Sequence, residues 1–270
     1  MTALGDSADL TALAAPDRPL PVLRHTLVLA RRAVRKSGRT PESWMDVIVQ
    51  PVLFLLLFAY LFGAAVSGSP KRYTQYLVPG LLVQTLLLAT VAVGVNLNAD
   101  VRGGVFDRFR SLPIARCAPL LGAALAEVVR YLAATVVTVG VGYLLGWRPD
   151  QGIVAAIGGC ALAIGFAFCL SWLPVLVGLT ARTPGAVQGV LLPVMFPLTF
   201  GSNVFVPMNS VPGWLQAFVK VNPVSQVTAS TRALMDGGAL ARPLLWTLLW
   251  MVGLLAVLVP ASVAAYRARE

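Results

Sequence analysis

The sequence predicts an all-α integral membrane protein with six transmembrane helices. The mean hydropathy is +0.78 and only 12% of the residues are charged, whereas a soluble domain has about 25% charged residues. Five stretches contain no Asp, Glu, Lys, Arg or His, and each is long enough to cross ~30 Å of hydrocarbon as a helix. These stretches are residues 47–66, 77–95, 152–180, 187–206 and 244–266. Their apolar residues are continuous rather than alternating, which argues against a membrane β-barrel.

The sixth expected span, residues 120–145, is charged only at Glu127 and Arg130. These residues are three apart and therefore share one helix face. A lone charge at the centre of a membrane helix costs ~2.5–3.5 kcal/mol on insertion scales, so we expect them to pair or to meet a wet interface. Two interpretations stay open. The two residues form a local ion pair, or the pair transmits motion to a pathway or contacts a polar substrate.

The segment before the first span divides into two parts. Residues 1–19 have no apolar signal-peptide core and carry three aspartates, so we expect a disordered cytosolic tail. Residues 20–38 have one apolar stripe and a basic opposite side, which predicts an amphipathic helix in the membrane interface. The stripe consists of Leu20, Leu23, Leu27, Ala30 and Val34. Residues 20–270 then form one transmembrane domain.

Lysine and arginine predict the orientation. Fourteen lie on the side that holds both termini and the loops after spans two and four, and six lie on the opposite side. The positive-inside rule therefore places both termini in the cytoplasm. We expect a multi-pass protein of a bacterial plasma membrane. The net charge of +10 is explained by anionic membrane lipids, so no nucleic-acid partner is expected.

The second half of the chain carries signals for caps and short helices. Thr183-Pro184 predicts an N-cap followed by proline at the first helical position. Pro193 and Pro197 predict a bent or broken fifth span. In the long external stretch 207–243, the apolar residues 211–219 are too few to span, so we expect a re-entrant or interfacial helix. Asn222 should cap a further short helix.

Motifs of catalysis and phosphate binding are missing from the sequence. It contains no G-x-x-x-x-G-K-[ST] phosphate loop, no G-x-S-x-G, no H-E-x-x-H and no C-x-x-C. The three cysteines suggest neither a disulfide framework nor a metal site. We therefore expect no catalytic residue, no metal and no cofactor on this chain.

The loop at residues 100–119 is short and basic and contains aromatic residues. Such a composition is not needed to join two membrane helices. It suits a docking surface for a cytosolic protein.

Three segments give the chain a resemblance to a known family. They are Phe106-Asp-Arg-Phe-Arg-Ser-Leu-Pro-Ile-Ala-Arg116, Ala126-Glu-Val-Val-Arg130, and Phe196-Pro-Leu-Thr-Phe-Gly-Ser-Asn-Val-Phe-Val-Pro207 with its continuation to Trp214, Asn222-Pro223 and Arg232. The chain resembles an ABC-2 type permease, the membrane subunit of a two-component ABC exporter of the daunorubicin-resistance type. It departs from the family pattern at Glu127, where Asp is also common, and at Gly185, where many relatives carry an acidic residue.

The resemblance implies a six-helix domain that pairs with a second permease copy, most simply as a homodimer. It also implies two copies of a separate ATP-binding subunit, which carries ATP and Mg. The coupling residues to that subunit would be Phe106, Asp107, Arg108, Phe109 and Arg110. Trp214, Phe218 and Asn222 would form the outer gate. Phe54, Phe58, Gln84, Phe196 and Phe200 would line the pathway.

The resemblance predicts ATP-driven export of hydrophobic or amphipathic compounds, such as a drug, an antibiotic or a lipid, by alternating access at the dimer interface. Export of a lipid-linked polysaccharide is an alternative within the same class. A lipid-processing integral membrane enzyme is an alternative from another class, but it would need polar groups in a cleft. A secondary transporter would show inverted repeats and buried carboxylates, and the sequence shows neither a repeat nor more than one acidic residue within a span.

Overall fold

The computed structural model describes residues 42–67, 69–104, 118–207 and 212–268. Its helices are α2 (Glu42–Ser67), α3 (Pro70–Arg102), α5 (Ala118–Leu144), α6 (Gly152–Leu170), α7 (Trp172–Thr180), α8 (Pro184–Phe200), α9 (Gly213–Val221), α10 (Pro223–Asp236) and α11 (Ala241–Arg267). The expected tail 1–19, the interfacial helix 20–38 and the coupling segment 106–110 lie outside the described residues.

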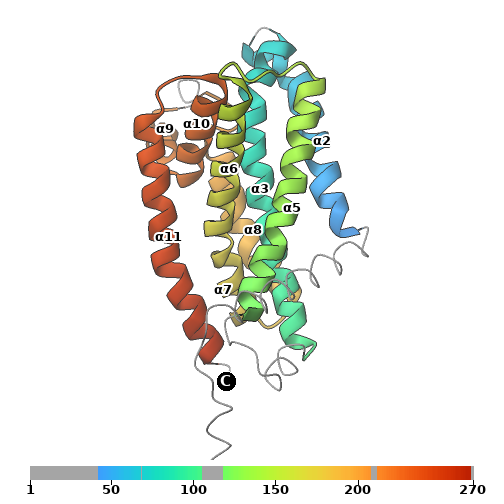
Figure 1. Cartoon of the computed structure of the whole chain (residues 1–270), viewed down its shortest axis with the longest axis vertical. Helices are drawn as coiled ribbons and strands as arrows, with labels where there is room; N and C mark the ends of the chain where they lie inside the picture. The colour runs from blue at the N-terminus through green and yellow to red at the C-terminus, as the bar shows by residue number, and fades with distance from the viewer. Residues whose placement is uncertain (1–41, 68, 105–117, 208–211, 269–270) are drawn as a thin grey trace, which may run out of the picture.

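The helices form one elongated bundle (Figure 1). We call the end with α9, α10 and the start of α3 the upper end, and the end with the C-terminal part of α11 the lower end. Among the described residues, four stretches are long and apolar enough to cross a membrane: α3 from Lys71, α5 from Glu127, α6 with α7, and α11. The apolar stretches Val47–Gly63 of α2 and Pro184–Phe200 are shorter. The chain is therefore membrane-embedded.

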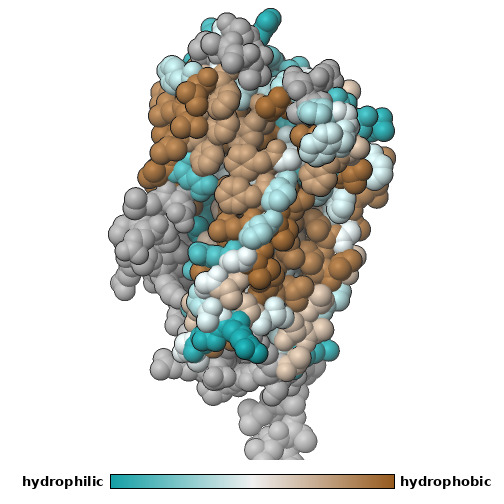
Figure 2. Space-filling model, turned by 180° about the vertical axis from the view of Figure 1, so that it is seen from behind, coloured by the Kyte–Doolittle hydropathy of each residue, from teal (hydrophilic) through white to brown (hydrophobic). Residues whose placement is uncertain are grey.

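The core of the bundle is built around α3. This helix of 33 residues is ~50 Å long at 1.5 Å per residue, and it packs against α2, α5, α6, α7, α8 and α10. Leu77, Leu82 and Leu86 on α3 are fully buried. By contrast, α11 leaves most of its apolar surface exposed. Figure 2, the view from behind, shows apolar side chains over much of the surface, crossed by a diagonal row of more polar ones.

The expected fourth span consists of two helices, because the chain breaks at Ser171. Pro174 has no N–H to donate to the carbonyl of Leu170, so the helical bonding pattern is interrupted there. At the break, the Ser171 hydroxyl donates to the Phe168 carbonyl at 2.7 Å. The part below the break, α7, packs against α3 and α11, while α6 packs mainly against α10 and α3.

A close crossing of α3 and α7 fixes the lower half of the bundle. A Cβ on Gly94 would collide with the Pro174 carbonyl oxygen, and a Cβ on Gly178 would lie 2.5 Å from the Gly94 carbonyl oxygen. Only glycines allow backbones to approach this closely. Beside the crossing, the Asn98 amide donates to the carbonyls of Gly178 and Ala181 at 2.9 and 2.8 Å, which satisfies carbonyls at the end of α7.

The expected cap at α8 is confirmed, but the helix ends earlier than hydropathy suggests. The Thr183 side chain accepts from the Ala186 N–H, and Pro184 occupies the first turn. The helix stops at Phe200, whereas the apolar stretch continues to residue 206. One reason is that the Leu198 carbonyl, which a longer helix would use for residue 202, accepts instead from the Asn222 amide at 2.8 Å.

The crossing of α3 and α7 generates a stability prediction. Gly94→Ala should destabilise the protein by about 1–3 kcal/mol, because the new methyl group forces the two backbones apart. Gly140→Ala, on α5 with open space around it, is the matched control and should have no destabilising effect. Thermal unfolding in detergent measures both, and an equal midpoint for the two variants would contradict the assigned role of the crossing.

Candidate functional site

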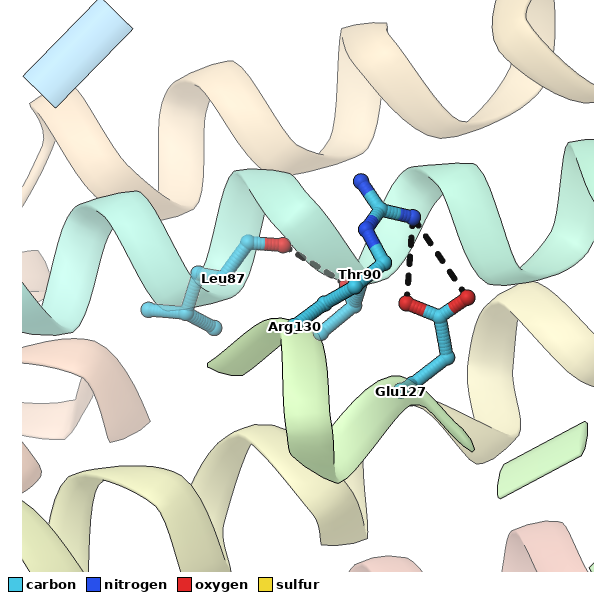
Figure 3. A network of polar contacts seen from close by, with 4 residues as sticks. All are labelled: Leu87, Thr90, Glu127 and Arg130. Carbon is cyan, nitrogen blue, oxygen red and sulfur yellow. Dashed lines mark hydrogen bonds and ion pairs between the residues drawn. The ribbon is translucent and has the colours of Figure 1, made fainter. Parts of the chain in front are cut away.

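The charged residues of α5 form a buried ion pair. Nη1 of Arg130 lies 3.1 Å from Oε2 and 3.4 Å from Oε1 of Glu127. Glu127 is 7% exposed and Arg130 is 4% exposed. Figure 3 shows both side chains extending from α5 toward α3, where the Thr90 hydroxyl donates to the Leu87 carbonyl at 2.6 Å. The spacing of three residues brings the charges together as expected.

The pair is not fully satisfied by its partner. Among the described residues, the Nε of Arg130 has no hydrogen-bond partner. Buried donors without partners are costly. The pair is therefore a place where a water molecule, a polar ligand or a rearranged helix would gain a contact.

Four of the expected pathway residues belong to a continuous strip of stacked rings, which we call the aromatic strip. On α2, Phe54 and Phe58 stack at 5.9 Å between centroids, and Phe58 and Phe62 stack at 5.2 Å. On α8, Phe196 and Phe200 stack at 5.5 Å.

Phe205, in the segment after α8, joins the two parts of the aromatic strip. Its ring stacks on Phe58 at 4.2 Å and on Phe200 at 5.2 Å. Phe205 is 6% exposed, while Phe196 and Phe200 are nearly half exposed. Each such ring pair contributes about 0.5–1.5 kcal/mol beyond area burial, so the strip holds α2, α8 and this segment together while presenting apolar rings outward.

Gln84, the fifth expected pathway residue, does not join the aromatic strip. It lies inside the bundle on α3 and is 1% exposed. Within the described part of the chain, neither its amide nitrogen nor its amide oxygen has a hydrogen-bond partner.

The expected outer-gate residues lie on α9 and at its junction with α10. Trp214 and Phe218 are 76% and 45% exposed, whereas Asn222 is buried. The Asn222 amide donates to the carbonyls of Leu198 and Gly201, and its oxygen accepts from the Val224 N–H. Asn222 therefore caps α10 as expected, and it also fastens the start of α10 to the end of α8.

Sequence reasoning missed a polar network at the upper end. Arg232 on α10 donates to the Tyr76 carbonyl at 3.0 Å, and its guanidinium lies 3.7 Å from the centroid of the Tyr76 ring. The hydroxyls of Tyr76 and Tyr73 donate to the carbonyls of Asn203 and Phe205 at 2.7 and 2.9 Å. These bonds hold the segment after α8 against α3.

The sequence contained one signal for this network. Tyr73 and Tyr76 are three residues apart, so they share a helix face near the start of the second span. Their partners lie more than 120 residues away in the chain, and no local pattern identifies such partners.

No metal centre is formed by the part of the chain that the structure describes. There, no group of three His, Cys, Asp or Glu side chains gathers where it could hold an ion.

The apolar helices define a membrane-embedded protein. Comparison with known proteins identifies its family. Residues 24–235 match the ABC-2 type transporter family. The chain is 39% identical to the daunorubicin resistance ABC transporter permease protein DrrB1 of Streptomyces coeruleorubidus, over 95% of this chain and 92% of that protein. It is 30% identical to the doxorubicin resistance ABC transporter permease protein DrrB of Mycobacterium tuberculosis, over 91% of this chain and 89% of that protein. The chain belongs to the ABC-2 type transporter family.

The ion pair generates a prediction from charge burial. Arg130→Met should destabilise the protein by about 3–5 kcal/mol, because it leaves the Glu127 carboxylate buried without a partner. The double variant Arg130→Met with Glu127→Gln should recover most of that loss. Thermal unfolding in detergent compares the stability of the two variants. A double variant no more stable than the single one would show that the loss comes from something other than the unpaired Glu127 carboxylate.

Proposed function

We propose that this chain is the permease subunit of an ATP-driven exporter that moves hydrophobic or amphipathic compounds, such as drugs, antibiotics or lipids, out across the plasma membrane. The observation that carries the proposal is the 39% identity, over 95% of this chain, to a permease named for daunorubicin resistance. The aromatic strip supports the same substrate class, because exposed rings attract apolar and aromatic molecules.

The proposed orientation puts the lower end in the cytoplasm. Arg102, Arg182 and Arg267 are exposed near that end, at the ends of α3, α7 and α11. Over the full sequence, fourteen Lys and Arg lie on this side and six on the other, so the positive-inside rule favours the cytoplasm here. Together with α2 and α8, the four longer stretches make six membrane spans in this proposal. An even number of spans places both termini on the same side, the cytoplasm. The helices α9 and α10 then lie in the external half.

ATP and Mg belong, in this proposal, to two copies of a separate ATP-binding subunit. The contact to that subunit is made by residues 106–110 between α3 and α5. Phe109 is the apolar anchor, and Arg108 and Arg110 orient it through their charges, since aromatic residues and arginines dominate interface energetics.

The second permease copy is proposed to pack on α8. Gly185 and Gly189 lie four residues apart on α8, with open space where a Cβ would stand. Gln188 is exposed beside them, although a polar side chain is costly in lipid. Small residues at this spacing let two membrane helices approach closely, and polar side chains bond across such contacts.

Transport then follows from alternating access between the two copies. ATP binding favours the outward-open state only through contacts that differ between the states. The Glu127–Arg130 pair lies on α5, the helix that follows residues 106–110 in the chain, and it faces α3, so we propose that it transmits movement of the ATP-binding subunits. The aromatic strip lines the pathway, and Trp214, Phe218 and Asn222 form the outer gate.

Export of a lipid-linked polysaccharide is the second candidate. The observation that favours it is the continuity of the aromatic strip through six rings on α2, α8 and the segment between α8 and α9. Sugar faces stack on aromatic rings, so a strip of this kind also suits a polymer. Transport assays with drug and with glycolipid substrates separate the two candidates.

The coupling contact can be tested by recruitment of the ATP-binding subunit. Phe109→Ala combined with Arg110→Glu should leave the chain in the membrane but strongly reduce the amount of ATP-binding subunit that co-purifies, because both the anchor and its charge are lost. Lys220→Glu, on the opposite side of the membrane, is the control and should recruit normally. Full recruitment by the double variant would overturn the assignment.

The proposed contact between copies can be tested by disulfide cross-linking. With the native cysteines replaced by alanine, Gln188→Cys on α8 should form a cross-linked dimer under mild oxidation in membranes. Gly253→Cys, in open space on α11, should remain monomeric. Equal cross-linking at the two positions, or cross-linking at Gly253→Cys alone, would refute the α8 interface.

A further inference from the structure

Three separate elements meet at the upper end of the bundle: the start of α3, the end of α10 and the connection between α5 and α6. Gln75 at the start of α3 donates from Nε2 to Oδ1 of Asp236 at 3.0 Å, and also to the Arg148 carbonyl. Its oxygen accepts from the Arg148 N–H at 3.2 Å. One amide group thus ties the end of α10 to the connection between α5 and α6.

A second contact joins the same two elements. The Gln151 N–H donates to the Met235 carbonyl at 3.1 Å. Gly237 follows with a φ of +91°, and a Cβ there would lie 2.8 Å from the Gln151 side-chain nitrogen. The end of α10 therefore sits tightly against residues 148–151. We call the contacts of Asp236, Gln75, Arg148 and Gln151 the upper latch.

Asp236 is the titratable acceptor of the upper latch. Burial raises the pKa of Asp236 from 3.8 to about 6, and the nearby Asp150 carboxylate adds to the rise, while Arg232 and the hydrogen bond from Gln75 partly offset it. Arg148 does not neutralise Asp236, because its guanidinium donates to the carbonyls of Tyr143 and Trp147 and lies over the Tyr143 ring. The other charged groups on the described elements at this end are Lys71 and Arg72 on α3, Lys220 on α9 and Arg242 on α11.

The sign of the pH dependence follows from that environment. In the closed latch the ionised carboxylate is disfavoured, whereas in an open, hydrated state Asp236 returns toward its ordinary pKa. The closed state therefore binds the extra proton between about pH 4 and pH 6. Closure is favoured at acid pH and weakens as the pH rises through 6.

We propose that the upper latch is a pH-sensitive closure, held shut when Asp236 carries a proton and opened readily when Asp236 is ionised. With the orientation proposed above, the latch faces the external medium. Mild external acid then holds the C-terminal end of α10 against the start of α3 and residues 148–151, and neutral pH loosens that end, while the bonds from Arg232 to the Tyr76 carbonyl remain. The closure itself rests on the contacts at this end, and only its role in export rests on the proposed function.

Hydrogen exchange of the purified full-length chain tests the proposal, with each rate normalised to the intrinsic rate at that pH. Protection of the Arg148 and Gln151 amides should be about tenfold or more greater at pH 4.5 than at pH 7.5. A shift of one pKa unit corresponds to tenfold, and partial hydration of Asp236 reduces the full effect.

Two variants separate the latch from a general effect of pH. Asp236→Asn keeps the shape without the charge and should show the acid-state protection at both pH values. Asp150→Asn should move the transition to lower pH, because the like charge is removed. A pH dependence that persists in Asp236→Asn would overturn the proposal, as would no pH dependence in the unaltered chain. Because exchange is measured without transport, either failure leaves the proposed export function untouched.

Discussion

The burial of α3 is the constraint on which the rest of the structure depends. This helix packs against six others, and its polar side chains bind backbone carbonyls of the segments that reach it. Asn98 fixes the end of α7 near the lower end, and Tyr73 and Tyr76 fix the segment after α8 near the upper end. In an apolar solvent each such bond is favoured, because a carbonyl left without a donor has no water to replace it.

The outer helices α8 and α11 differ from α3 because they leave most of their apolar surface exposed. α8 buries only one stripe, formed by Val187, Leu191, Met195 and Thr199, and α11 buries even less of its length. These faces need lipid or another protein surface.

The sequence predicted what depends on local pattern. Long apolar runs gave the helices, Thr183 and Asn222 gave the caps, and a spacing of three gave the Glu127–Arg130 pair. What it missed depends on distant partners. Hydropathy continued span five to residue 206, but Asn222 takes the Leu198 carbonyl and the helix ends at Phe200. Likewise, Arg232 and Tyr76 are 156 residues apart, and no periodicity connects them.

The most direct test of this account is reconstitution. The chain and its ATP-binding subunit would be placed in liposomes, and ATP-dependent movement of daunorubicin measured by fluorescence. Daunorubicin should accumulate only when ATP, this chain and the ATP-binding subunit are all present. It should move from the side where ATP is hydrolysed to the opposite side. Movement that proceeds equally without ATP, or with the ATP-binding subunit omitted, would contradict the claim that the chain is the membrane half of an ATP-driven exporter.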